Sequence, residues 1–289
     1  MEYEAARTTR LGNRDSNQDR VSILEGEDAV LLLVADGMGG RAGGELAAQT
    51  LVESSTDIFD KLATPVANPA FLLRRLLVRG HEAVLEAGRR NPPLTPGTTA
   101  VACLIQEGFA CWAHVGDSRL YLVRDGAIVE RTRDHSYVEQ LCQKGKLDED
   151  ERGKHPMRNF VTRCLGLRAN PPEIAVGRPV ALQPGDVIVL CSDGFWEGTD
   201  EETMGKLLQD DDLDTVLDDL ASTAEKARYP RADNITAAAL RIVDLNTHAT
   251  QVPAKPVEKT PPESSSDRLN AAIADIERAF EQYRDEMGG

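Results

Sequence analysis

Short apolar runs separated by longer helical patterns constrain the fold of this chain most strongly. The runs are rich in small and β-branched residues, which favours buried strands, and all are far shorter than the roughly 20 residues of a membrane-spanning helix. Helical spacing appears over 51–62 and 213–224, and Thr199 with Glu202 predicts a capping box at a helix start. We therefore predict one globular domain over residues 1–245, with strands at Ala29–Ala35, Thr99–Ile105, Cys111–Val115, Leu120–Val123, Val187–Cys191 and Ile235–Val243.

The charge and aromatic content exclude several kinds of partner. The 33 Lys and Arg residues stand against 48 Asp and Glu residues, so the formal net charge is -15. Such a chain attracts neither a nucleic-acid backbone nor an anionic membrane. Aromatic residues make up only 4%, too few for a platform on which single strands stack. We therefore expect neither nucleic acid nor membrane as a partner.

The cysteines and the N-terminus indicate a reducing compartment. The 5 cysteines are odd in number and scattered, with no C-x-x-C pair. This argues against a disulfide framework and against a thiolate zinc site. The first residues show no basic start followed by an apolar stretch, as a secretory signal would. We expect a cytoplasmic protein.

The composition changes after residue 245. Prolines among Lys, Glu, Thr and Ser over 246–266 predict an extended linker. Over 267–289 an amphipathic helix is predicted, and it either folds back onto its own domain or dimerises or docks a partner. Its apolar seam consists of Leu269, Ile273, Ile276, Phe280, Tyr283 and Met287.

Aspartates adjoin several of the predicted strands. Most aspartates in such places only form turns. Two of these, however, are followed directly by a glycine, Gly37 in one case and Gly194 in the other. Glycine at these positions lets the backbone approach an ion closely. Converging carboxylates need a cation between them, and ligands that are all oxygen suit Mg²⁺ or Mn²⁺. Two such ions about 4 Å apart can acidify a water for in-line attack. The aspartates in question are Asp19, Asp36, Asp117, Asp193 and Asp233.

Arg14 lies five residues before Asp19. A guanidinium group beside a pair of metal ions would hold phosphate oxygens in a bidentate clamp. The other interpretation is a surface arginine that pairs with Asp15. The sequence pattern alone leaves both open.

The ordered set of these motifs closely resembles one family, the metal-dependent protein phosphatases (PPM, or type 2C, serine/threonine phosphatases) in their bacterial form. The motifs span most of the chain, from about Arg14 to Val243, and their complete order is far more specific than any one of them. They are Arg14 with Asn17-Gln18-Asp19, Asp36-Gly37-Met38-Gly39-Gly40, Gly97-Thr98-Thr99-Ala100, Gly116-Asp117-Ser118-Arg119, Asp134-His135-Ser136, Ser192-Asp193-Gly194 and Asp233-Asn234.

The resemblance implies an α+β fold, with a central β-sandwich of two antiparallel sheets flanked by helices and a metal cleft at one end. It implies two core Mn²⁺ or Mg²⁺ ions, with catalysis depending on Asp36, Asp193 and Asp233. Gly37 would be a ligand through its carbonyl, and Asp117 would hold a third, weaker ion. Arg14 would bind the phosphate, and residues 134–160 would form a flap over the substrate. The implied core ligands are Asp19, Asp36, Gly37, Asp193 and Asp233.

The implied reaction is hydrolysis of phosphoserine and phosphothreonine on proteins, including targets of a serine/threonine kinase. A water activated between the two ions would attack phosphorus in line, without a phosphoenzyme. Met38 stands two residues after Asp36, where animal relatives often have a histidine proposed as the general acid. The donor of the leaving-group proton therefore stays open, with a metal-bound water as our hypothesis.

Two other functions compete with this one. Gly37, Gly39 and Ala42 fit a dinucleotide-binding fingerprint after a strand. Against it, Asp36 would adjoin the pyrophosphate, and Asp57 lies in a helical pattern rather than at the end of a second strand. The second alternative is a non-catalytic scaffold of the same fold that binds phosphoproteins. It is disfavoured because none of the expected metal carboxylates is missing.

Overall fold

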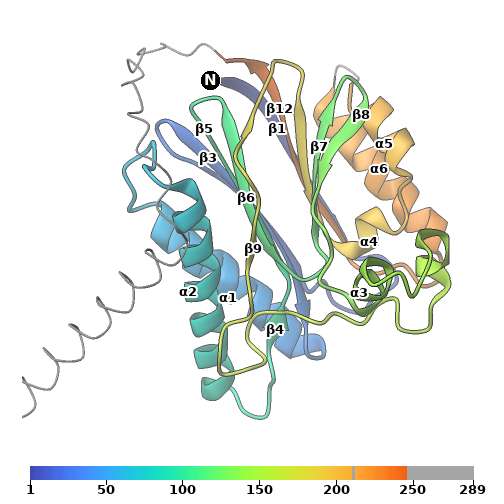
Figure 1. Cartoon of the computed structure of the whole chain (residues 1–289). Coiled ribbons are helices and arrows are strands. Elements are labelled where there is room, and N and C mark those ends of the chain that lie inside the picture. The colour runs from blue at the N-terminus through green and yellow to red at the C-terminus, as the bar shows by residue number, and fades with distance from the viewer. Residues whose placement is uncertain (210–211, 246–289) are drawn as a thin grey trace, which may run out of the picture. The chain divides into compact units, whose positions relative to one another are not determined.

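Two antiparallel β-sheets face each other, with helices on both outer faces (Figure 1). The computed structural model describes residues 1–209 and 212–245, and in these ranges the predicted α+β sandwich is confirmed. Every helix there is too short or too polar to traverse a bilayer. The predicted linker over 246–266 and helix over 267–289 lie outside the described residues.

The first sheet has the strand order β1-β12-β11-β7-β8, and all its pairings are antiparallel. Strand β11 has the predicted bounds. Strand β1 was not predicted, because it is an edge strand in which only Ala6 is buried. The strands are β1 Glu2–Arg10, β7 Arg119–Arg124, β8 Ala127–Arg131, β11 Val187–Cys191 and β12 Ile235–Asp244.

The second sheet has the order β10-β6-β5-β3-β2, with β4 also paired to β3 and β9 to β6. Its pairings are antiparallel as well. The strands are β2 Asp19–Glu25, β3 Ala29–Met38, β4 Gly97–Thr98, β5 Ala100–Gln106, β6 Phe109–Val115, β9 Ala175–Val176 and β10 Val180–Ala181.

Strand β3 is buried on both faces, which explains its continuous apolar run. Leu32 and Val34 pack between the two sheets, in one cluster with Leu190 of β11. Leu31 and Leu33 point the other way and pack under the helices that cover the second sheet. Because side chains alternate along a strand, a strand covered on both sides needs apolar residues at every position.

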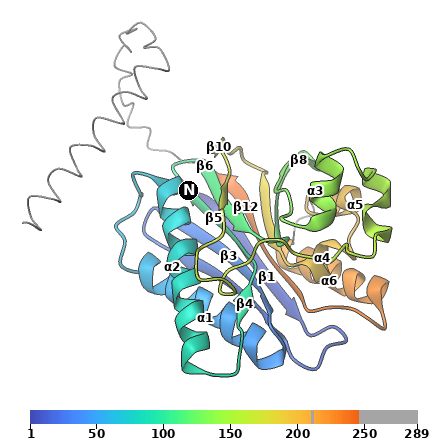
Figure 2. The same ribbon diagram turned by 60° about the horizontal axis from the view of Figure 1, so that its bottom comes forward.

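Helices α1 (Arg41–Phe59) and α2 (Pro69–Arg90) cover the second sheet. Helices α4 (Asp193–Trp196), α5 (Glu201–Leu207) and α6 (Leu213–Arg228) lie on the side of the first sheet (Figures 1 and 2).

The start of α5 differs from its prediction by one residue. Asp200 is the N-cap, and its side chain accepts a hydrogen bond from the Thr203 N–H (2.8 Å). The Thr199 hydroxyl instead donates to the Phe195 carbonyl (2.7 Å). Asp is as good an N-cap as Ser or Thr, so the predicted capping box at Thr199 and Glu202 is wrong.

The strand topology excludes the alternative of a dinucleotide-binding site. The fingerprint requires a parallel sheet built from βαβ units. Strand β3, which leads into the glycine turn before α1, has antiparallel neighbours on both sides, β2 and β5.

Candidate metal centre

Five aspartates meet at one end of the sandwich, because neighbouring strands alternate in direction. Asp19 begins β2 and is the cross-strand partner of Asp36, near the end of β3. Asp117 lies between β6 and β7, Asp193 begins α4 just after β11, and Asp233 lies two residues before β12. Both sheets therefore contribute carboxylates to the same place.

Buried hydroxyl groups fix the first two aspartates. The Thr98 hydroxyl and the Thr99 N–H both donate to the Asp36 carbonyl, each at 2.9 Å. The Ser192 hydroxyl donates to Asp19 Oδ2 (2.7 Å). All three donors are fully buried. The motif over 97–100 thus positions Asp36, a role that the sequence analysis did not assign, and Ser192 does the same for Asp19.

Four carboxyl groups of the cluster, those of Asp19, Asp36, Asp117 and Asp193, resist ionisation. Burial raises the pKa of Asp19 to about 6 and that of Asp117 to about 7, although the hydrogen bond from Ser192 partly offsets the effect at Asp19. Burial, and then the charges of neighbouring aspartates, hold the pKa of Asp36 and of Asp193 well above the ordinary range. Carboxylates so placed repel one another, and a divalent cation between them would relieve the repulsion.

The turn after Asp36 is packed so closely that it has no space for a side chain. A Cβ atom at Gly37 would lie 2.1 Å from the Gly44 carbonyl oxygen and 2.7 Å from that of Gln18. The Gly37 N–H donates to this same Gln18 oxygen (3.2 Å). Only glycine allows this approach of three backbone segments.

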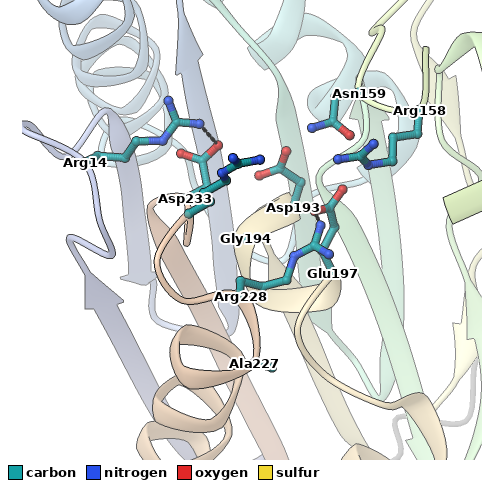
Figure 3. Close-up of a pocket in the computed structure, with 10 residues that line it drawn as sticks. Arg14, Arg158, Asn159, Asp193, Gly194, Glu197, Ala227, Arg228 and Asp233 are labelled. Carbon is teal, nitrogen blue, oxygen red and sulfur yellow. Dashed lines mark hydrogen bonds and ion pairs between the residues drawn. The ribbon is translucent and has the colours of Figure 1, made fainter. Parts of the chain in front are cut away.

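Arg14 reaches the cluster from the loop between β1 and β2. Its Nη2 donates to Asp233 Oδ2 (Figure 3). Buried Asn234 holds this loop in place, since its side chain donates to the carbonyls of Leu11 (2.9 Å) and Ser16 (3.1 Å). The Asp-Asn motif thus combines a charged residue of the site with a residue that positions Arg14.

A buried cluster around Arg119 adjoins Asp117. Arg119 donates to both carboxylate oxygens of Asp134, at 2.8 and 2.7 Å. Its guanidinium carbon lies 3.5 Å from the centre of the Trp196 ring. The Trp196 Nε1–H in turn donates to the Asp117 carbonyl (2.9 Å). This Arg119 cluster joins the base of the predicted flap to Asp117 and to α4, the helix that Asp193 begins.

The predicted flap, residues 134–160, contains helix α3 (Tyr137–Gln143) and the 3₁₀ helix η1 (Glu149–Lys154). A bridge between Ser136 and Val161 closes its base. Between its last turn and the aspartates lies a pocket of about 270 Å³. Its lining residues are Arg14, Arg158, Asn159, Asp193, Gly194, Glu197, Ala227, Arg228, Arg231 and Asp233.

The donor set suits hard divalent ions. Across the described ranges, no three acidic, histidine or cysteine side chains are drawn together tightly enough to hold an ion by themselves. Mg²⁺ keeps several waters and is bound through one or two carboxylates, so the crowded, all-oxygen set at this end of the sandwich fits it and the related Mn²⁺.

The family follows from a direct comparison. The sequence model of the family described as protein phosphatase 2C matches residues 8–240. This chain belongs to the protein phosphatase 2C family. The prediction of a PPM-type serine/threonine phosphatase from the ordered motifs is therefore confirmed.

Individual relatives agree with this membership. A putative 2C-type protein phosphatase of Streptococcus pyogenes is 31% identical over 215 residues, 74% of this chain and 83% of that protein. The serine/threonine protein phosphatase PstP of Mycobacterium tuberculosis is 32% identical over 248 residues, 86% of this chain but only 46% of PstP. The chain thus spans about half the length of PstP.

The fold of a solved relative matches as well. The catalytic domain of PstP, in complex with two manganese ions, has a TM-score of 0.71 and 29% identity, over 84% of this chain and 99% of that one. A relative with this fold thus binds two manganese ions.

Proposed function

We propose that this phosphatase hydrolyses phosphoserine and phosphothreonine esters of proteins with two Mn²⁺ or Mg²⁺ ions held among the clustered aspartates. The meeting of five aspartates at one end of the sandwich, with Arg14 beside them, carries the proposal. When bound, such a pair of ions makes a water acidic enough to attack phosphorus in line and offsets charge on the phosphoryl oxygens. The proposed ligands are Asp19, Asp36, Asp193, Asp233 and the Gly37 carbonyl.

The protein residues orient the substrate for this attack. Arg14, whose guanidinium already bonds Asp233, would hold two phosphoryl oxygens in its planar fork. Asp117, which is 5% exposed and close enough to interact electrostatically with Asp193, would hold a third ion.

Three of the five cysteines are poorly suited to act as a nucleophile in place of water. Burial raises the pKa of Cys103, Cys111 and Cys191 above the ordinary thiol value. All three are buried and stay as thiols at neutral pH, whereas a cysteine nucleophile must be a thiolate. The substrates would be phosphorylated proteins, among them targets of a serine/threonine kinase, and a cytoplasmic location stays a prediction.

Phosphate release from a phosphothreonine peptide, measured against Mn²⁺ concentration, tests the proposal. We expect turnover that rises to saturation with Mn²⁺ and stops on addition of EDTA. Folded protein that binds the peptide and releases no phosphate at any Mn²⁺ or Mg²⁺ concentration would contradict it. That result would favour the alternative of a phosphoprotein-binding scaffold.

A further inference from the structure

The pocket beside Asp193 carries more positive charge than one phosphate requires. Four arginines line it, on a chain whose net charge is -15. Two of them are neutralised locally, since Arg14 pairs with Asp233 and Arg228 pairs with Glu197. The remaining two, Arg158 and Arg231, are exposed.

Arg158 and Arg231 come from different elements on the rim of one pocket. Arg158 lies in the last turn of the predicted flap, where its backbone N–H donates to the His155 carbonyl (3.0 Å). Arg231 lies in the turn after α6, where its backbone N–H donates to the Arg228 carbonyl (2.8 Å). Among the residues that the structure describes, neither guanidinium has a hydrogen bond or an ion pair.

Arg158 lies apart from the proposed phosphate clamp, whereas the turn that carries Arg231 is bonded to Asn13, the neighbour of Arg14 in the chain. Figure 3 shows Arg158 and Asn159 reaching toward Asp193 from the side opposite Arg14. Hydrogen bonds fix the turn that carries Arg231, because Ala232 and Asn13 bond each other through the Ala232 N–H (3.2 Å) and the Asn13 N–H (2.9 Å). Because neither guanidinium has a partner among the described residues, both are available to an anion.

We propose that Arg158 and Arg231 form a subsite for a second anion of the substrate, either another phosphate or an acidic side chain near the phosphorylated residue. This rests on the proposed function, since the first phosphate must occupy the metal centre. An extended peptide advances about 3.4 Å per residue, so an anion one to three residues away would lie roughly 3–10 Å along the chain from the first phosphate. Guanidinium groups bind phosphate and carboxylate through paired, charge-assisted hydrogen bonds.

Three phosphothreonine peptides test this subsite: one with neutral neighbours, one with Asp and Glu neighbours, and one with a second phosphoserine two residues away. The variant is R158A/R231A, and R75A is its control, because Arg75 is exposed on α2 and lines no part of this pocket. We expect the wild type and R75A to prefer the anionic peptides by roughly tenfold in kcat/KM, as one or two charge-assisted hydrogen bonds would give. In R158A/R231A this preference should fall toward one, and 0.5 M salt should weaken it in the wild type.

The comparison between the three peptides shows which kind of anion the subsite binds. A preference for the doubly phosphorylated peptide alone supports a phosphate subsite, and equal preferences support any carboxylate or phosphate. A wild-type preference near one, or equal losses by R158A/R231A on all three peptides, overturns the proposal. If no peptide is hydrolysed, the proposed function fails. The subsite is then tested by fluorescence anisotropy, which gives the affinity for each anionic peptide relative to the neutral peptide in the wild type and in R158A/R231A.

Discussion

One methyl group added at residue 37 should be enough to disrupt the site. In G37A, the new Cβ would meet the Gly44 carbonyl at 2.1 Å, a backbone atom that cannot rotate away. We expect a loss of about 1–3 kcal/mol in the free energy of unfolding, as for other overpacked positions, together with loss of turnover. Urea denaturation in EDTA measures the first effect. The control is G153A, where a Cβ meets nothing within 4 Å, and equal stability of the two variants would contradict the account.

Arg14 offers a test of substrate binding that leaves the core intact. Its side chain is 54% exposed, so R14A should fold normally. We expect KM for a phosphothreonine peptide to rise roughly tenfold, because charge-assisted hydrogen bonds contribute about 1.5–3 kcal/mol and this one is partly in solvent. Turnover at saturation should fall only modestly. Steady-state kinetics at saturating Mn²⁺ check this, and an unchanged KM would exclude the clamp.

At the scale of elements, α4 connects two parts of the site. It begins with Asp193 and ends with Trp196, whose indole N–H bonds the Asp117 carbonyl at 2.9 Å. W196F keeps an aromatic ring against Arg119 and removes only this hydrogen bond, so we expect about 1 kcal/mol lower stability. The Mn²⁺ concentration for half-maximal turnover should rise, because Asp117 loses its support. Identical Mn²⁺ curves for W196F and wild type would show that Trp196 has no positioning role.

The elements and site residues that could be predicted from the sequence are those marked by a pattern among neighbouring residues. The apolar run of β11 was predicted within its observed bounds, and the five aspartates were identified because each adjoins such a run. Helix α2 was missed, although Asn68 caps it and its buried residues Leu72, Leu73, Leu76 and Leu77 follow a helical period.

Pairings across the fold could not be predicted from the sequence. Arg119 and Asp134 are 15 residues apart and meet because β7 and β8 pair and bring the ends of this hairpin together. The juxtaposition of Arg158 with Arg231 depends on the position of the flap against α6 in the same way. Such contacts depend on how the sheets and loops assemble, which no local pattern records.

At the scale of the whole molecule, the site is built from both sheets. The predicted C-terminal helix over 267–289 is expected to act in assembly or partner binding rather than in catalysis. That helix lies outside the described residues, and its apolar seam in the sequence motivates the prediction. Deletion of residues 246–289 should change the oligomeric state or the binding of a partner, with turnover within about twofold of the full chain. Light scattering and steady-state kinetics on both forms check this. The same number of chains per particle in both forms would remove the dimer version, and a large loss of turnover would place the segment in catalysis.

The central claim is that the clustered aspartates hold the ions on which turnover depends, and the D193N variant tests it most directly. The substitution keeps the shape of the side chain and replaces a carboxyl group of the aspartate cluster with a neutral amide, so the metal-free fold should be at least as stable as the wild type. Calorimetric titration with Mn²⁺ and phosphate release should be measured on the same samples. We predict that binding weakens and turnover falls together by more than about 100-fold, since loss of an outer-shell partner alone costs 10–100-fold. Wild-type turnover in D193N, or full Mn²⁺ binding without turnover, would contradict the assignment of this site.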